Sequence, residues 1–124
     1  KKKISAYPEN FSGGVNVAAG DLDGNSIYEI VTAPASSALP EVRVYSSAGD
    51  WQRAFLAYTD KFQGGVNLAV GDIDRDGQAD IITGPGAGGG PHLIVFDGFG
   101  RIKNQFFPAD KTSRGGLSVG IIKL

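Results

Sequence analysis

Residues 62–80 read FQGGVNLAVGDIDRDGQAD, and residues 11–29 read FSGGVNVAAGDLDGNSIYE. The two stretches lie 51 positions apart. Extending the comparison over residues 11–50 and 62–101 needs no gap and finds 15 identities in 40 positions. A third copy begins at Gly115, again 51 positions after its counterpart. Self-similarity at a fixed spacing indicates a repeat architecture, in which each unit buries its apolar face against its neighbours.

The composition narrows the function classes. A hydrophobic fraction of 41% and a charged fraction of 20% are ordinary for a folded domain, so disorder is not expected. The net charge of −1 argues against nucleic acid or an anionic membrane as a partner, because both attract basic surfaces. No run of about 18 apolar residues occurs, so no membrane insertion is predicted. The chain has no cysteine, which excludes disulfides and thiolate metal sites.

Each copy divides into four short β-type stretches separated by Gly, Asn, Asp and Pro. Gly49 and Gly100 mark tight hairpin connections between the third and fourth stretches, since glycine accepts a positive φ without steric cost. No segment shows a sustained helical periodicity, and the chain is predicted to be all-β. The strands are expected over residues 14–20, 29–33, 42–46 and 53–58 in the first copy, and 65–71, 80–84, 93–97 and 104–109 in the second.

Four antiparallel strands in a unit of about 50 residues are typical of a β-propeller blade. Small residues such as Ala18 and Ala69 suit the crowded inner strand, and bulky residues such as Phe55 and Phe106 suit the outer strand. A stacked solenoid is the alternative arrangement. We therefore predict a partial propeller of about two and a half repeats of 51 residues: an outer strand of a partial blade over residues 1–10, blade repeats over 11–61 and 62–112, and an inner strand of a partial blade over 113–124.

Oxygen-bearing side chains recur in the loop between the first and second strands of each copy, at the first, third, fifth and ninth positions. A glycine at the sixth position permits a sharp turn, and the seventh residue can offer its carbonyl. Ca²⁺ collects six to eight oxygens at about 2.3–2.6 Å, whereas Mg²⁺ fits less well because it prefers an octahedron with retained waters. The predicted metal ligands are Asp72, Asp74, Asp76, Gln78 and Asp80 in the second loop, and Asp21, Asp23, Asn25, Ile27 and Glu29 in the first.

Asp and Asn also favour turns, but turn formation accounts for one Asp-Gly pair and not for the same four positions in two loops. The first loop departs from the pattern because Ser26 stands where glycine is expected, and because it carries three carboxylates instead of four. We therefore expect two Ca²⁺ sites, with the second loop the stronger. In the third copy the first ligand position is Lys123, which excludes a site there.

With these residues the chain resembles the FG-GAP repeats of the integrin α-subunit propeller and of many secreted bacterial proteins, also called VCBS repeats. Phe62 with its two following glycines, Thr83-Gly-Pro-Gly and residues 72–80 occupy the family's Phe-Gly, Gly-Ala-Pro and calcium-loop positions. Phe11, Thr32-Ala-Pro and residues 21–29 do the same less faithfully, and residues 86–98 are similar to bacterial members. The resemblance implies an extracellular or cell-surface, calcium-braced propeller that serves adhesion, surface assembly or as a non-catalytic module of a larger protein.

No catalytic constellation is evident, and the chain is predicted not to be an enzyme. It has a single histidine, His92, no cysteine and no Gly-x-Ser-x-Gly motif, so no nucleophilic triad is expected. The glycine run at residues 86–90 lacks a following Gly-Lys-Ser/Thr and predicts a turn. Trp51, Tyr45 and Tyr58 leave open a sugar-stacking platform. The alternatives to a structural role are therefore a carbohydrate-binding propeller and an accessory module of a larger secreted enzyme.

The partial blades predicted at the two ends would leave strand edges with unpaired backbone groups, which invite strand addition. The expected partners are other copies of this chain or the rest of a longer chain. Surface proteins and glycans are further candidates.

Overall fold

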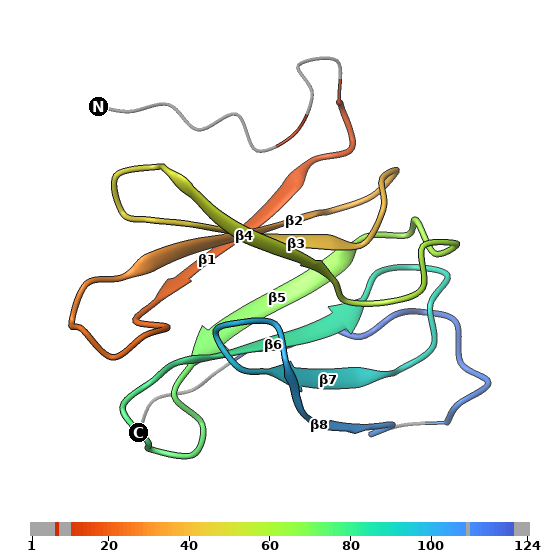
Figure 1. Ribbon diagram of the computed structural model, residues 1–124. Helices are drawn as coiled ribbons and strands as arrows, with labels where there is room; N and C mark the ends of the chain where they lie inside the picture. Colours follow the sequence, from red (N-terminus) through yellow and green to blue (C-terminus); the bar gives the residue numbers. More distant parts are fainter. Residues whose placement is uncertain (1–6, 8–10, 109, 121–124) are drawn as a thin grey trace.

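A computed structural model describes Tyr7, residues 11–108 and residues 110–120 of the chain. These residues form two four-stranded antiparallel sheets, one from each repeat, with the strands of each sheet in chain order (Figure 1). The prediction of an all-β chain with four antiparallel strands per repeat is confirmed. The strands are β1 (Val15–Gly20), β2 (Glu29–Pro34), β3 (Glu41–Tyr45) and β4 (Trp51–Leu56) in the first sheet, and β5 (Val66–Gly71), β6 (Asp80–Pro85), β7 (Leu93–Phe96) and β8 (Ile102–Phe106) in the second.

The strand register positions the two acidic loops. Gly20, the last residue of β1, lies opposite Glu29, the first residue of β2. Gly71 and Asp80 are paired in the same way at the ends of β5 and β6. The carboxylate that opens β2 or β6 is therefore held against the base of the loop, beside the aspartate that follows β1 or β5.

The fourth strand of each sheet begins two residues earlier than predicted. The predicted strands covered residues 53–58 and 104–109, whereas β4 begins at Trp51 and β8 at Ile102. The reason is the connection before the strand, which is closed by a hydrogen bond from the Ser46 N–H to the Asp50 carbonyl (2.8 Å). A register shift between Val44 and Tyr45 then pairs Tyr45 directly with Trp51. The second sheet repeats this shift between Val95 and Phe96.

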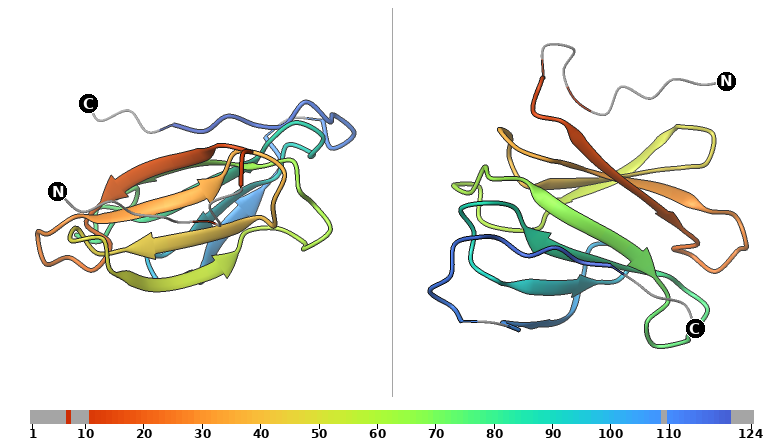
Figure 2. Two further views of the ribbon diagram at one scale, coloured as in Figure 1. Left: turned by 90° about the horizontal axis from the view of Figure 1, so that it is seen from above. Right: turned by 180° about the vertical axis from the view of Figure 1, so that it is seen from behind.

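The two sheets share one apolar core. Val31, Val42 and Val44 of the first sheet and Val66 and Ile81 of the second are fully buried and belong to the same cluster. β5 contacts both β1 and β2, so the second sheet packs against the first near the first-strand edge. Figure 2 shows the two sheets stacked on each other. The repeats are therefore one packed unit, as expected for repeats that bury their apolar faces on their neighbours.

One side-chain contact recurs wherever a repeat meets the next copy. The Asn16 side-chain amide donates to the Val66 carbonyl (2.6 Å). Fifty-one residues later, the Asn67 amide donates to the Leu117 carbonyl (2.8 Å). The Leu117 N–H also bonds the Pro85 carbonyl (2.8 Å), so this segment lies on the second sheet as β5 lies on the first. Residues 113–120 contain no regular strand, and residues 121–124 of the predicted inner strand lie outside the described residues.

A second contact recurs near the other end of the chain. The Tyr7 hydroxyl donates to the Glu41 carbonyl (3.0 Å), and the Tyr58 hydroxyl donates to the His92 carbonyl (2.7 Å), with both partners shifted by 51 positions. Tyr7 thus takes the place on the first sheet that Tyr58 takes on the second. The other residues of the outer strand predicted over 1–10 lie outside the described part, apart from Tyr7.

The described residues form two stacked sheets and do not close a ring. None of them belongs to a helix long and apolar enough to cross a membrane.

Candidate metal centres

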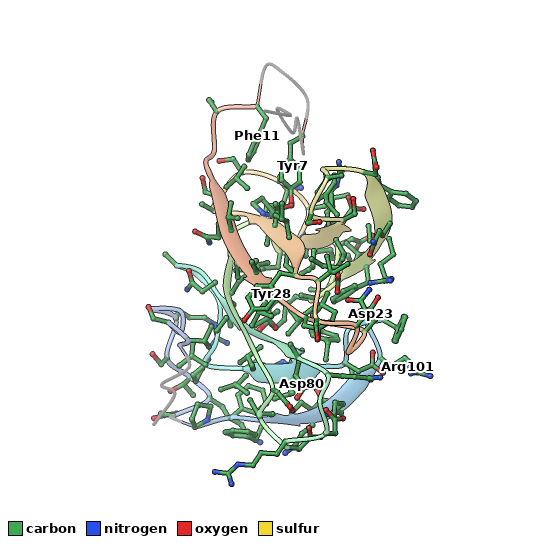
Figure 3. All side chains as sticks on the ribbon, turned by 90° about the vertical axis from the view of Figure 1, so that its left-hand side faces the viewer. Tyr7, Phe11, Asp23, Tyr28, Asp80 and Arg101 are labelled. Carbon is green, nitrogen blue, oxygen red and sulfur yellow. The ribbon has the colours of Figure 1, made fainter. Side chains whose placement is uncertain are left out.

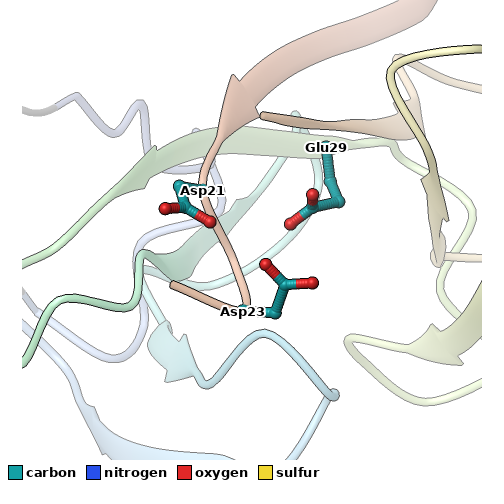
Figure 4. A group of neighbouring side chains, drawn as sticks. All are labelled: Asp21, Asp23 and Glu29. Carbon is teal, nitrogen blue, oxygen red and sulfur yellow. The ribbon is translucent and has the colours of Figure 1, made fainter. Parts of the chain in front are cut away.

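Three carboxylates converge in each acidic loop. In the first loop Asp21 follows β1, Asp23 lies two residues on, and Glu29 opens β2. One oxygen from each lies within 4.8 Å of the others, and the three side chains point toward one another (Figure 4). The second loop brings together the equivalent residues Asp72, Asp74 and Asp80.

Both loops lie at the same end of the stacked sheets. This end is on the left of Figure 1 and faces the viewer in Figure 3, where Asp23 and Asp80 are labelled. The two clusters are therefore neighbours in space as well as equivalents in sequence.

The first aspartate of each loop organises the turn around itself. Asp21 accepts backbone N–H groups from Gly24 (2.9 Å), Asn25 (3.1 Å) and Ser26 (2.8 Å). Asp72 accepts the equivalent bonds from Asp76 (3.1 Å) and Gly77 (2.8 Å) in the second loop. Short polar side chains stabilise turns in this way. The aspartate common to both repeats therefore shapes the loop as well as contributing a candidate ligand.

The fifth position of each loop has a different role from the one predicted. The Asn25 side-chain oxygen accepts the Ile27 N–H (2.9 Å), and Asp76 Oδ1 accepts the Gln78 N–H (2.9 Å). All four residues are exposed, and Asp76 is not among the three converging carboxylates. In each loop, then, the structure brings together three of the five predicted ligand residues, while the fifth and seventh bond to each other.

The buried carboxylate at the ninth position shapes the electrostatics of the first cluster. Burial raises the pKa of Glu29, which is 4% exposed, although its Oε1 accepts the Leu22 N–H (2.8 Å). Burial also acts to raise the pKa of Asp21, but the N–H groups of Ser26, Gly24 and Asn25 outweigh it and the net shift is downward. Grouped carboxylates disfavour one another's ionised form, and a cation among them relieves that repulsion.

A lysine enters the second cluster. Lys103 of β8 places its Nζ 2.5 Å from Asp74 Oδ2, 2.8 Å from Asp80 Oδ1 and 4.0 Å from Asp76 Oδ2. Its hydrogen bonds to Asp74 and Asp80 raise the pKa of Lys103, and the bond from Lys103 lowers the pKa of Asp74. Burial raises the pKa of Asp80, which is 1% exposed, against the opposing effect of Lys103. Sequence reasoning missed Lys103, because its counterpart in the first repeat is Gln52 and the repeat gives no signal there.

The donor sets fit a hard divalent cation. Every converging side chain presents carboxylate oxygen, with no imidazole or thiol among them. Ca²⁺ and Mg²⁺ are bound through such oxygens, whereas softer transition metals favour nitrogen and sulfur.

The first loop also forms part of the contact between the repeats. The Asp21 carbonyl accepts the Ala79 N–H of the second loop (2.8 Å). Leu22 is 2% exposed and lies against Gly98 of the second repeat. The Arg53 guanidinium donates to the Gly98 carbonyl nearby (2.8 Å). Any ion that orders the first loop therefore also orders the surface on which the second repeat packs.

The remaining chemical candidates have structural surroundings. The His92 Nε2 lies 2.8 Å from the Gln105 Oε1, and its ring stacks on Phe107 with centroids 4.6 Å apart. The glycine run at 86–90 is a turn, as predicted, with the Gly89 N–H bonded to the Gly86 carbonyl (3.1 Å).

The three aromatic residues considered for sugar stacking differ in exposure. Trp51 is 62% exposed on β4, whereas Tyr45 is only 5% exposed and has no face to offer a sugar. Tyr58 is half-buried at a groove of about 700 Å³ that His92 and Phe107 also line.

Comparison of the chain with protein-family models, with curated proteins and with solved structures finds no match. The resemblance to FG-GAP repeats is therefore carried by the motif residues alone. The function has to be argued from the geometry of the two acidic loops and of the contact between the repeats.

Proposed function

We propose that this chain is a calcium-binding β-propeller-repeat module that works outside the cell or at its surface. Its role is structural, in adhesion or surface assembly, and it is not an enzyme. The observation that supports this best is the recurrence of one three-carboxylate cluster at equivalent positions of two repeats. A catalytic site would be singular, whereas a brace is needed once in every repeat.

The proposed brace acts through the loop that carries the ligands. Asp21 and Asp23 lie on either side of Leu22, and Leu22 packs into the core between the repeats. A cation held by these carboxylates and Glu29 would fix the loop backbone and keep Leu22 in place. Calcium binding would thus stiffen the contact between successive repeats, which is the property that a load-bearing surface module requires.

Calcium is favoured over magnesium by the form of the loops. Asp23 and Asp74 are exposed, so waters can complete a large, irregular coordination shell of the kind that Ca²⁺ accepts. Counted by carboxylates alone, the second loop has the richer donor set. Further repeats, from other copies or from the rest of a longer chain, are the proposed partners.

Thermal unfolding with and without calcium tests the proposal. A cation bound only by the folded state adds about 2.7 kcal/mol at a hundredfold excess over Kd, which corresponds to a rise in Tm on the order of 10 °C for a chain of this size. We expect the Tm in 5 mM CaCl₂ to exceed that in EDTA by this order, and 5 mM MgCl₂ to have a smaller effect.

The matched control is the double variant Asp23→Asn/Asp74→Asn, which keeps the size of both side chains and removes one ligand charge from each loop. Its Tm should respond little to calcium. An equal Tm for the wild-type chain in EDTA and in CaCl₂ would refute the calcium proposal.

A further inference from the structure

Lys103 differs from the other basic side chains of the chain in where it lies. It belongs to β8, the last strand of the second sheet, at the register shift where Phe96 pairs with Ile102 and Val95 pairs with Asn104. A bulge of this kind re-aims the extra residue, and such features occur next to functional sites. Here the bulge residue extends toward the β5–β6 loop and contacts its carboxylates.

The ammonium group lies among the oxygens that a metal ion would need. Its Nζ is 2.5 Å from Asp74 and 2.8 Å from Asp80, two of the three carboxylates that converge in the second loop. The Asp80 side chain is 2% exposed, so water is nearly excluded from this contact. An ammonium and a divalent cation cannot share the same lone pairs, and at this separation they repel each other.

The first repeat provides a comparison within the same molecule. Its bulge lies at the same place in β4, where Tyr45 pairs with Trp51 and Val44 with Arg53, and the extra residue is Gln52. Among the described residues, the ion pairs include none between a basic side chain and Asp21, Asp23 or Glu29. The two loops therefore differ in one respect that their own sequences do not show, namely an internal cation on the neighbouring outer strand.

We propose that Lys103 is an internal competitor of the metal ion: it braces the second loop when metal is absent and must be displaced before metal binds. This inference rests on the proposed calcium-binding function and reverses the ranking that the ligand sets alone predict. The first loop, with Gln52 beside it, becomes the tighter site. The second loop keeps its shape without calcium and binds it only at higher concentration.

Displacement of Lys103 is physically reasonable. Its side chain is 28% exposed, and β8 is an edge strand whose residues all lie at the surface, so the ammonium can turn into water without unpacking the core. Binding at the second loop then exchanges a bond to lysine for a bond to calcium, whereas binding at the first loop only relieves repulsion.

Calorimetric titration with CaCl₂ tests the inference one loop at a time. Asp23→Asn disables the first loop and leaves the second, and Lys103→Gln is then added to give the second repeat the residue of the first. We expect Lys103→Gln to lower the Kd of the second loop at least tenfold. The control is Lys61→Gln in the same background, which removes an equal charge from the β4–β5 connection and should change the Kd less than twofold. In EDTA, Lys103→Gln should lower the Tm because the internal brace is lost.

The reciprocal variant provides a second measurement that does not depend on how Lys103→Gln folds. In an Asp74→Asn background, which leaves the first loop, Gln52→Lys should raise the Kd of that loop at least tenfold. Calcium binding with a Kd that Lys103→Gln leaves unchanged would overturn this inference alone; if that variant does not fold, an unchanged Kd in Gln52→Lys would do so. Absence of calcium binding in the wild-type chain and in every variant would overturn the proposed function together with it.

Discussion

Leu22 and Ile73 occupy the same position in the two repeats, one residue after the first aspartate of each loop, but their surroundings differ. Leu22 is 2% exposed, and a Cβ added to Gly98 would come within 2.8 Å of it. Ile73 is 49% exposed. The repeat comparison predicts the same role for both residues. It cannot show which one is covered, because the covering residue comes from the other repeat.

This difference predicts unequal costs of truncation. Leu22→Ala should lower the free energy of unfolding by about 2–5 kcal/mol, since a large buried side chain is lost and a cavity remains between the repeats. Ile73→Ala, the matched control, should cost less than about 1 kcal/mol, as for an exposed position. Urea denaturation followed by circular dichroism measures both. Equal losses would mean that Leu22 does not hold the repeats together.

Tyr58 is a second residue whose role depends on the other repeat. Its hydroxyl lies 3.1 Å from Thr83 Oγ1 and donates to the His92 carbonyl (2.7 Å). Tyr58→Phe should lower the free energy of unfolding by about 1 kcal/mol at pH 8, the usual net value of a hydrogen bond.

The pH dependence of this loss has a definite sign. Burial raises the pKa of Tyr58 to about 12 from its usual value of 10.0. The unfolded chain therefore releases the proton first, and the stability that Tyr58 adds is complete below pH 10 and lost as the pH rises toward 12. The gap in stability between the wild-type chain and Tyr58→Phe should be constant from pH 8 to 10 and shrink above it. A gap that grows with pH would contradict the burial of this hydroxyl.

At the scale of elements, the two acidic loops share a backbone form that their sequences express differently. Each loop has two residues with positive φ: Gly24 (80°) and Ser26 (68°) in the first, Arg75 (60°) and Gly77 (88°) in the second. The sequence pattern predicted only one such position, the sixth. It missed the fourth because each loop places its glycine at a different one of the two positions.

The non-glycine residues at these positions are expected to be strained. A left-handed backbone costs an L-residue roughly 1–2 kcal/mol, partly offset by the greater freedom of glycine in the unfolded chain. Ser26→Gly and Arg75→Gly should each raise the free energy of unfolding in EDTA by up to about 1 kcal/mol, and Gly77→Ala should lower it. Urea denaturation provides the measurement. A loss of stability in both glycine variants would show that the side chains of Ser26 and Arg75 support the loops.

The strands show how far the pattern of residues determines the elements. Six of the eight strands begin within one residue of the predicted starts, because Gly, Pro and Asp bound short β-branched stretches such as β2 and β6. β4 and β8 were misplaced by two residues, because a bulge adjusts their pairing and a bulge leaves no mark in composition. The same bulge carries Lys103, so the error in the strand start and the missed contact at the second loop have one cause.

At the scale of the whole molecule, the two ends present surfaces that are buried where the repeats meet. On the first sheet Val17 is 64% exposed and Tyr28 is 61% exposed, whereas the equivalent of Tyr28, Ala79, is 6% exposed. On the second sheet Phe106 is 47% exposed, whereas its equivalent Phe55 packs on the shared core. Residues 114–117 cover the inner part of this second face and leave its outer part open. The two faces differ, so association through them would be head to tail.

Head-to-tail association is therefore the last prediction. Light scattering should show the molar mass rising above 12.9 kDa as the concentration of the chain increases, because Val17 and Phe106 then find partners of the kind that bury their equivalents within the molecule. Val17→Asp should suppress the rise. Trp51→Asp, at a position whose counterpart Ile102 is also exposed, should not, since this position faces solvent in both repeats. A compact monomer of 12.9 kDa at every concentration would show that these faces do not join copies of this chain, and would leave further repeats of a longer chain as their remaining partners.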